Sequence, residues 1–331
     1  MSDRREQLLV VVLPALNEEA TVGQVVAGIP RQIPGIDRVE AIVIDDGSTD
    51  GTVDAARAAG AAVVSHGWRR GVGDAFSTGI EAALALGADY IVNMDSDGQF
   101  DPADIPRLLE PLLERRAEFA TCTRFGNKDL EPEMPAVKKW GNRMMCRIVN
   151  WIIWGGRFTD VSCGFRAYTR ETALKLNLFG RFTYTQESFI DLAAKGVRMV
   201  EVPLRVRGVR EHGRSRVASN LWRYGTNALL IILRSMRDIR PLKFFGLIAA
   251  VLLALGFLQG LFVFAWWVAT GYTSPFRSVL IGSGTFLTIG FIVAVLALLA
   301  DMIGRLRRCV ERVLLIEKRR EHDDRAKGNG A

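Results

Sequence analysis

The sequence predicts an α/β protein built on a Rossmann-like, mostly parallel sheet and followed by two membrane-spanning helices. Over the first half of the chain, short apolar runs typical of buried strands alternate with segments of helical length. Beyond Phe244, two stretches without a charged residue exceed the ~20 residues that cross a bilayer. Ligands of such sheets bind at the carboxyl ends of the strands, so we expect the functional site there.

Four strands are expected in the first part of the chain. The apolar runs that predict them are Leu8–Leu13, Val39–Ile44, Ala61–Ser65 and Tyr90–Met94. The helices between them are expected at Thr21–Ile29, at Val53–Ala59, and from the loop after Trp68 to about Leu86. Polar or acidic turns follow three of these strands, at Asn17-Glu18, Asp45-Asp46 and Asp95/Asp97. Parallel strands end at one edge of a sheet, so these turns should converge on one crevice.

The second half of this region continues the pattern with less regular spacing. Helices are expected at Ile105–Arg116, Val137–Trp154 and Phe182–Lys195, and strands at Glu118–Thr123 and Val197–Val206. A loop is expected at Phe125–Pro135, and a compact polar turn at Asp160–Tyr168. A further amphipathic helix is expected at Asn220–Ile239.

Two basic segments allow two interpretations each. Val137–Trp154 could be an ordinary amphipathic core helix, or a helix at the bilayer interface, which Trp140, Trp151 and Trp154 favour. The arginine-rich segment Arg207–Arg216 could be a solvated loop or a flexible clamp for phosphates. We favour the clamp, because the chain also carries a candidate metal–diphosphate site.

That candidate is the acidic turn after the fourth strand. Asp95 and Asp97 alternate along an extended segment, so both side chains project to the same face. Two neighbouring carboxylates repel each other unless a cation lies between them. Hard oxygen ligands suit Mg²⁺ or Mn²⁺, which commonly bridge carboxylates and substrate phosphates. The turn is therefore predicted to bind a metal–diphosphate.

The composition argues against several other kinds of site and indicates which kind of partner to expect. The four cysteines form no CxxC pair and the three histidines are dispersed, which argues against a zinc site, a histidine metal site or a disulfide framework. The net charge is +7. We expect an anionic membrane surface as the partner rather than nucleic acid, because lysines and arginines cluster beside the apolar segments.

The flanking charges predict the orientation in the membrane. Basic residues precede the first uncharged stretch, Phe244–Val268, and follow the second, Ser278–Ala300. By the positive-inside rule, both ends of the membrane segment are cytoplasmic.

Several motifs in order carry a resemblance to a known family. LPALNEE, VIDDGSTDGT, RRGVGDA and NMDSDGQFDP together resemble the nucleotide-binding half of a family 2 glycosyltransferase with the GT-A fold. The resemblance to polyprenyl-phosphate glycosyltransferases, which include dolichyl-phosphate mannose synthase and bacterial undecaprenyl-phosphate glucosyltransferases, rests on further segments: TRF, DVSCGFRAY, Gln186-Glu187 and EVPLRVRGVREHGRSR. It covers Leu8–Arg216 by motif and the remainder by architecture.

The resemblance implies roles for individual residues. It implies nucleotide binding by Pro14, Leu16, Glu18, Ile44, Asp46, Asp95 and Ser96. It implies Mg²⁺ or Mn²⁺ at Asp95, Asp97 and Gln99, and an acceptor phosphate at Arg124, Lys138 and Asn142. Catalytic roles are implied for Asp97, Arg124, Glu187, Arg210 and Arg216. Leu16 replaces an aromatic residue common in the family, and Arg216 a common lysine.

The resemblance also implies a reaction and a layout. The reaction is inverting transfer of one sugar from a UDP- or GDP-sugar to a polyprenyl phosphate at the cytoplasmic face of the cell membrane. The layout is a cytoplasmic GT-A domain at 1–216, a juxtamembrane amphipathic helix at 217–243, two transmembrane helices at 244–303 and a charged cytoplasmic tail at 304–331. The tail and the resemblance suggest a homo-oligomer.

The chemistry of the acceptor agrees with this reaction. A phosphate monoester is largely anionic at neutral pH and needs little help from a general base. The catalytic demand falls on the charge of the departing nucleoside diphosphate, which a metal and arginines can neutralise.

Two alternatives remain. A processive polysaccharide synthase is disfavoured because two spans are few for a translocation channel and no QxxRW-like element is present. A non-catalytic membrane protein that binds nucleotide sugars is disfavoured because both aspartates, Gln99 and the arginine segment are present.

Overall fold

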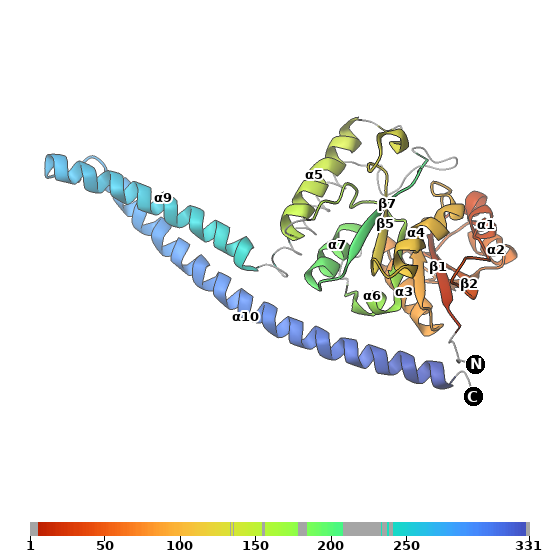
Figure 1. Cartoon of the computed structure of the whole chain (residues 1–331). Coiled ribbons are helices and arrows are strands. Elements are labelled where there is room, and N and C mark those ends of the chain that lie inside the picture. The colour runs from red at the N-terminus through yellow and green to blue at the C-terminus, as the bar shows by residue number, and fades with distance from the viewer. Residues whose placement is uncertain are drawn as a thin grey trace. The chain divides into compact units, whose positions relative to one another are not determined.

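The structure is a computed structural model that describes residues 6–132, 134, 136–153, 156–177, 184–207, 233, 237 and 241–328 (Figure 1). The side chains of residues 128, 137, 138 and 323–328 are likewise outside the description. Contacts divide the chain into two units, Met1–Ile232 with Leu315–Ala331, and Leu233–Leu314. Each unit is described by itself.

The first unit contains a seven-stranded sheet among its described residues, in the order β3-β2-β1-β4-β6-β5-β7. The strands are β1 (Leu8–Ala15), β2 (Arg38–Asp45), β3 (Ala62–Ser65), β4 (Tyr90–Asn93), β5 (Phe119–Thr123), β6 (Arg166–Thr169) and β7 (Met199–Pro203). The pairs among β1 to β4 are parallel, as is the pair of β5 with β7. Strand β6 runs antiparallel to both neighbours. The predicted mostly parallel α/β sheet is thus confirmed.

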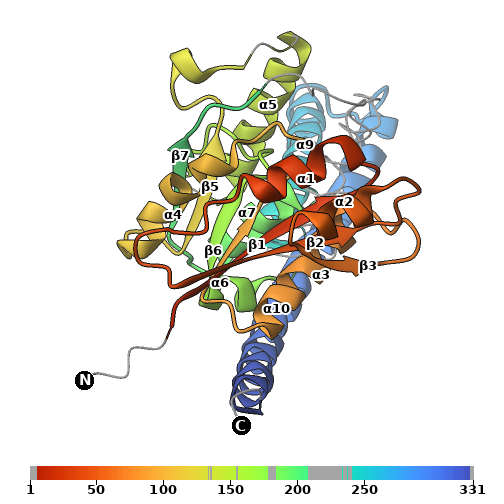
Figure 2. The same cartoon turned by 90° about the vertical axis from the view of Figure 1, so that its right-hand side faces the viewer.

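Helices cover both faces of this sheet (Figure 2). They are α1 (Glu19–Ala27), α2 (Thr52–Ala58), α3 (Val72–Ala85), α4 (Ile105–Leu113), α5 (Ala136–Ile153), α6 (Arg170–Lys175) and α7 (Thr185–Ala194), with 3₁₀ turns η1 (Pro102–Asp104) and η2 (Lys128–Leu130). On β1, Leu9, Val11 and Leu13 share a core with residues of α1, α2 and α4. Val12 faces α3 instead. This burial on both faces explains why β1 is a continuous apolar run.

The approach of α3 to the sheet depends on Gly79. A Cβ at this position would lie 2.1 Å from Cγ1 of Val12 and 3.2 Å from Cγ1 of Ile44. Any side chain would therefore push the helix away from β1 and β2.

Strand β6 corrects the prediction of a compact polar turn over Asp160–Tyr168. The turn ends at Phe165, and Arg166–Thr169 forms the strand between β4 and β5. Arg166 is fully buried, and its guanidinium donates to the carbonyls of Cys163 (2.8 Å) and Val161 (3.2 Å). A four-residue strand that begins with a charged residue lacks the apolar run by which strands are predicted.

Other differences concern the ends of elements. The helix predicted to reach Arg116 ends at Leu113, and Arg115 adopts a φ of +57° that stops it. The strand predicted at Val197–Val206 is limited to Met199–Pro203. The helix predicted at Asn220–Ile239 lies outside the described residues apart from Leu233 and Arg237, both helical.

The second unit is formed mainly by two long helices, α9 (Pro241–Thr270) and the part of α10 (Arg277–Gly328) up to Leu314. Both are long and apolar enough to cross a membrane, and only 17% and 11% of their most apolar windows are buried. They contain the predicted spans Phe244–Val268 and Ser278–Ala300. The large exposed apolar surface indicates a membrane protein, because water would not tolerate it.

Small residues bring α9 and α10 together. The Ser283 hydroxyl donates to the Gly256 carbonyl at 2.7 Å. A Cβ at Gly256 would lie 2.9 Å from Leu287 Cγ, and one at Gly260 would lie 2.9 Å from Ser283 Oγ. Glycines four residues apart allow such close contact between membrane helices.

Candidate active site

Three turns meet at the carboxyl edge of the sheet. The register of β1 with β2 places Ala15 opposite Asp45. The Asn17 backbone amide donates to Ser48 Oγ (2.9 Å), and the Asn17 side-chain oxygen accepts from the Thr49 amide (2.8 Å). On the other side, Ser96 Oγ donates to the carbonyl of Pro14 at 2.9 Å. The predicted convergence of these turns is therefore confirmed.

The acidic turn is held tightly at its centre. Ser96 and Asp97 are buried, and the Ser96 carbonyl accepts from Thr21 Oγ1 at 2.8 Å. One carboxylate oxygen of Asp97 accepts from the Gln99 amide at 3.0 Å. Asp95 is partly exposed. The two carboxylates thus lie on a short turn that hydrogen bonds hold at the carboxyl edge of the sheet.

Gln99 connects this turn to the segment after β7. Its side-chain amide donates to the Arg207 carbonyl at 3.0 Å, and the Arg207 amide donates to the Gln99 carbonyl at 3.0 Å. The side-chain oxygen of Gln99 is the atom whose chemistry suits a metal. Arg207 is the first residue of the predicted clamp, whose catalytic candidates Arg210 and Arg216 lie outside the described residues.

The side chains at this turn supply only part of a coordination shell for a divalent metal. The described residues contain no group of three or more His, Cys, Asp or Glu side chains that could hold a metal by themselves. Asp95 and Asp97 supply two carboxylates, and Gln99 can add a neutral oxygen. This set fits Mg²⁺ or Mn²⁺ when substrate phosphates provide further ligands, as is common for these ions.

Asp46, a predicted nucleotide residue, is buried and organises the loop before α3. Its carboxylate accepts from the backbone amides of Arg70 (2.8 Å) and Gly71 (2.9 Å). Its Oδ1 also lies 3.1 Å from Nδ1 of His66. Next to it, Gly47 has a φ of +82°, and a Cβ there would lie 2.6 Å from the backbone of the same loop. The RRGVG segment is therefore fixed beside the end of β2.

The neighbouring Asp45 accepts hydrogen bonds from residues of two other segments. Its carboxylate accepts from the Ser48 amide (2.8 Å) and from Ser65 Oγ (2.6 Å). Burial alone would raise the pKa of Asp45, but the hydrogen bonds from Ser48 and Ser65 outweigh it and hold this pKa below its ordinary value. Asp45 is thus an ionised anchor of the turn after β2.

The other residues predicted to bind the nucleotide differ in how exposed their side chains are. Pro14, Leu16 and Glu18 are partly exposed at the end of β1. Ile44 is fully buried, and its side chain packs beneath Gly79. Only the backbone of Ile44 can therefore border a pocket at this edge.

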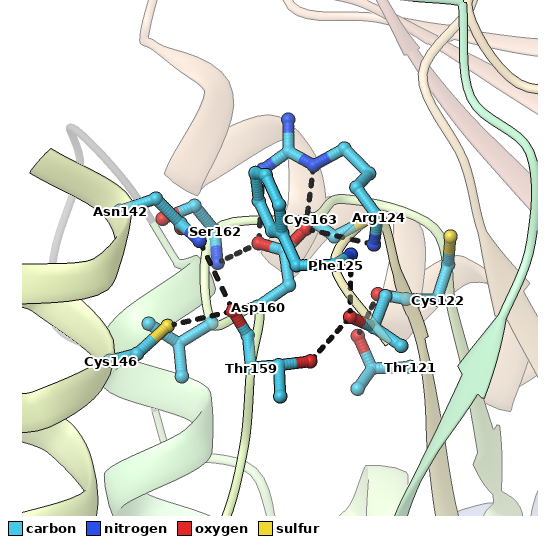
Figure 3. Close-up of polar contacts among 12 residues, drawn as sticks. Thr121, Cys122, Arg124, Phe125, Asn142, Cys146, Thr159, Asp160, Ser162 and Cys163 are labelled. Atoms are coloured by element: carbon cyan, nitrogen blue, oxygen red, sulfur yellow. Dashed lines mark hydrogen bonds and ion pairs between the residues drawn. The ribbon is translucent and has the colours of Figure 1, made fainter. Parts of the chain in front are cut away.

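Arg124 follows β5 and forms a two-pronged ion pair with Asp160 (Figure 3). Its Nε lies 2.6 Å from Oδ2 of Asp160, and its Nη2 lies 3.0 Å from Oδ1. Burial acts to lower the pKa of Arg124, but the Asp160 carboxylate outweighs it and raises this pKa. The guanidinium is therefore permanently charged and held in one orientation. Asp160 lies within the quoted DVSCGFRAY motif, but sequence reasoning assigned it no role.

Side chains of helix α5 form hydrogen bonds with the segment that carries Asp160 (Figure 3). Asn142 Nδ2 and Cys146 Sγ each donate to the Thr159 carbonyl at 3.2 Å. One turn further, Asn150 exchanges two hydrogen bonds with the backbone of Phe158, at 2.8 and 3.1 Å. The role that the structure shows for Asn142, which was predicted to meet an acceptor phosphate, is to support this segment. Lys138 belongs to α5, but its side chain lies outside the described residues.

Glu201 on β7 was missed by sequence reasoning. Its carboxylate accepts from the amides of Thr159 (2.7 Å) and Asp160 (2.8 Å) and from Thr159 Oγ1 (2.9 Å). Burial nevertheless raises the pKa of Glu201, and the nearby Asp160 carboxylate adds to the rise. A single acid in the motif EVPLRV gives no signal that would have distinguished it from a surface residue.

Glu187, predicted to be catalytic, lies in the first turn of α7 and is partly buried. Its neighbour Gln186 is buried and donates to Ser162 Oγ at 3.1 Å. This bond joins α7 to the same segment that carries Asp160.

The face of α5 that is turned away from these contacts is exposed. Trp140 is 65% exposed and Trp151 is 52% exposed. Met144, Arg143 and Arg147 are exposed between them. Helical spacing places all five side chains on one face.

Comparison with known proteins identifies the family. The family described as Glycosyl transferase family 2 matches residues 10–176, just over half of the 331 residues. The chain therefore belongs to glycosyltransferase family 2.

Two relatives and one solved structure illustrate the similarity. The UDP-N-acetylglucosamine–dolichyl-phosphate N-acetylglucosaminyltransferase of Methanococcus voltae is 27% identical over 60% of this chain and 86% of its own. The undecaprenyl-phosphate mannosyltransferase of Micrococcus luteus is 28% identical over 64% and 88%. Glucosyl-3-phosphoglycerate synthase from Mycobacterium tuberculosis, in complex with Mn²⁺, uridine diphosphate and phosphoglyceric acid, matches with a TM-score of 0.54 and 28% identity over 70% and 78%. The α/β unit thus has the GT-A fold, as the motifs predicted.

Proposed function

We propose that the protein is a membrane-bound, inverting glycosyltransferase. It transfers one sugar from a nucleotide sugar to a polyprenyl phosphate at the cytoplasmic face of the cell membrane. The observation that carries the proposal is the bond of Ser96 to Pro14, which brings the Asp95–Asp97 turn to the edge where the turns after β1 and β2 meet. In a chain with two helices able to span a bilayer, a lipid-linked acceptor is the natural partner of such a site.

The named relatives support this acceptor and donor. Two of them act on dolichyl or undecaprenyl phosphate by name. The M. voltae relative is named for a UDP-sugar, and the M. tuberculosis synthase binds UDP with Mn²⁺. A UDP-sugar is therefore the first donor to test, and a GDP-sugar the second.

The chain's own residues have distinct tasks in this reaction. The turns after β1, β2 and β4 bind the nucleotide and fix the diphosphate at the strand ends. Asp95, Asp97 and Gln99 would hold a divalent ion, which when bound would offset charge on the leaving nucleoside diphosphate. Arg124, oriented by Asp160, presents a fixed positive charge to phosphate oxygens.

The acceptor phosphate attacks the anomeric carbon directly. It is anionic near neutral pH and needs no strong general base. As the new bond from phosphate oxygen to carbon forms, the bond to the leaving diphosphate breaks on the opposite side. The anomeric configuration therefore inverts.

We further propose that the exposed face of α5 lies at the membrane surface. Trp140 and Trp151 have the amphipathic rings favoured at that depth, and Arg143 and Arg147 match anionic headgroups. The opposite face of α5 holds the Asp160 segment, so the acceptor would reach the site close to the bilayer. This favours the interfacial interpretation of the helix over an ordinary core helix.

A donor and acceptor screen tests the proposal. The full chain in detergent is incubated with labelled UDP- and GDP-sugars, with and without polyprenyl phosphate, and the lipid products are analysed. A glycolipid carrying one sugar of inverted configuration is the expected result. A polymer would indicate a processive synthase, binding without turnover would indicate a non-catalytic protein, and retention would contradict the mechanism.

A further inference from the structure

A buried polar cluster lies behind Asp95. The Asn93 side-chain amide donates to the Gly164 carbonyl at 2.8 Å and to the Tyr184 hydroxyl oxygen at 2.7 Å. Asn93 is fully buried and Tyr184 is 2% exposed. Asn93 ends β4, two residues before Asp95, and pairs with Arg166 at the start of β6. The turn before β6 and the start of α7 therefore meet directly beneath the acidic turn.

The direction of these hydrogen bonds can be deduced. A carbonyl oxygen only accepts, so the Asn93 atom that faces Gly164 must be the amide nitrogen. The same nitrogen faces Tyr184, so the hydroxyl oxygen of Tyr184 is the acceptor in that bond. The proton of this hydroxyl must then point to a different acceptor.

The surroundings of Gly164 show that the Asp95 carboxylate is an acceptor close to this hydroxyl. A Cβ at this position would lie 3.1 Å from both carboxylate oxygens of Asp95 and 3.2 Å from the Tyr184 hydroxyl. The carboxylate and the hydroxyl thus border the same small space, which exists only because residue 164 has no side chain. An ionised carboxylate is a strong acceptor for a phenol.

We propose that Tyr184 is a positioning residue whose hydroxyl donates to Asp95 and fixes the orientation of that carboxylate toward the divalent metal. This inference rests on the proposed function of the acidic turn. Hydrogen bonds to metal ligands from a surrounding layer of residues commonly orient those ligands and strengthen metal binding.

The Tyr184 ring is held so that its hydroxyl has little freedom. It stacks on Phe76 with the ring centroids 4.0 Å apart and the planes 3° from parallel. The Arg166 guanidinium lies 5.7 Å from the Tyr184 ring centroid. The hydroxyl would therefore act as a fixed donor. Because it orients the Asp95 carboxylate in advance, less conformational entropy is lost when the metal binds.

The test measures Mn²⁺ binding to the full chain in detergent with saturating UDP, and electron paramagnetic resonance reports the binding. We expect Tyr184→Phe to weaken Mn²⁺ binding about tenfold, within the range typical for loss of such a hydrogen bond. Thermal unfolding is measured in parallel. Tyr168→Phe is the matched control, because Tyr168 is also fully buried but pairs with Ile91, and its hydroxyl lies beside Arg166. It should bind Mn²⁺ as the wild type does.

A folded Tyr184→Phe variant with wild-type Mn²⁺ affinity would overturn the inference. If that variant does not fold, Gly164→Ala replaces it, because the added methyl would press against both the Tyr184 hydroxyl and the Asp95 carboxylate. Unchanged Mn²⁺ affinity in Gly164→Ala would then overturn the inference. If the wild type binds Mn²⁺ in the presence of UDP and neither substitution alters that binding, only this inference is contradicted. Absence of such binding in the wild type would contradict the proposed function and the inference with it.

Discussion

Arg124 and Asp160 form two parallel hydrogen bonds across 36 residues of sequence, from Nε to Oδ2 and from Nη2 to Oδ1. Asp160 is completely buried, whereas the Arg124 side chain is 22% exposed. The Asp160 carboxylate also accepts from the Ser162 amide, and its own amide donates to Glu201. The direction of the arginine after β5 is thus set by the turn before β6 and by β7.

Asp160→Asn should reduce both stability and activity. It removes the negative charge opposite Arg124, which costs about 2 kcal/mol, less than for a fully buried pair because Arg124 is partly solvated. We expect kcat to fall about tenfold or more, because the guanidinium is no longer held in place. Thermal unfolding and initial rates at saturating donor measure the two effects.

The control for this substitution is Asp104→Asn. It breaks a surface ion pair with Arg107, which is 62% exposed, and such pairs contribute about 0–1 kcal/mol. Equal behaviour of the two variants would contradict an orienting role for Asp160.

Asp97→Ala should abolish turnover, with a loss of at least about 10³-fold, since the metal and its diphosphate lose a charged ligand. Chelation by EDTA should stop the wild-type enzyme, and Mg²⁺ or Mn²⁺ should restore it. Asp101→Asn is the control: the Asp101 carboxylate accepts from the Ala103 amide at 2.9 Å, and asparagine can do the same. Near-normal turnover in metal-free buffer would refute the role of the acidic turn.

Gly79→Ala should destabilise the protein by about 1–3 kcal/mol, because the methyl would overlap Val12 under α3. Gly141→Ala in α5 is the opposite case. A Cβ there meets no atom within 4 Å, so the substitution should stabilise the helix by up to about 1 kcal/mol. Melting temperatures in detergent compare the two variants, and shifts of the same sign would contradict this account of α3 packing.

Glu201 should make stability depend on pH. Its pKa is raised in the folded protein, so the folded state holds this proton more tightly than the unfolded chain does. Its contribution is therefore complete below the unfolded pKa of about 4.3 and is lost as the pH rises through the folded pKa. The melting temperature of the wild type relative to Glu201→Gln should fall as the pH rises from acid to neutral. A pH-independent difference would show that Glu201 does not titrate in this way.

Reversing the charges of Arg143 and Arg147 tests the exposed face of α5. The double change to glutamate should raise the apparent KM for polyprenyl phosphate about tenfold or more in vesicles with anionic lipid, where each basic residue near the surface is worth about 1 kcal/mol. The effect should shrink in neutral vesicles. Arg107→Glu on α4 serves as the control, and an equal response of both variants would argue against a membrane-facing α5.

Much of the α/β core could be predicted because its signals are local. The run at Leu8–Leu13 is apolar at every position since β1 is covered on both faces. Asp95 and Asp97 follow a buried strand, so their place at the carboxyl edge follows from the sheet being parallel there. The two spans needed only length and the lack of charge.

Strand β6 and the supports of the site could not be predicted in the same way. From the sequence, Arg166 is expected to be a polar residue in a turn. The structure shows that its guanidinium is buried and donates to a backbone carbonyl. Asn93 bonds with Gly164 and Tyr184 across 71 and 91 residues. No periodicity marks such contacts, because they depend on which strands become neighbours.

The sequence by itself therefore determined the class of fold, the acidic turn and the apolar spans, since each depends on residues close together in the chain. Tertiary structure alone decided what surrounds that turn. It inserted β6 between β4 and β5, paired Arg124 with Asp160, and placed Tyr184 behind Asp95. These relations arise from strand order and packing, which bring distant residues within hydrogen-bonding distance.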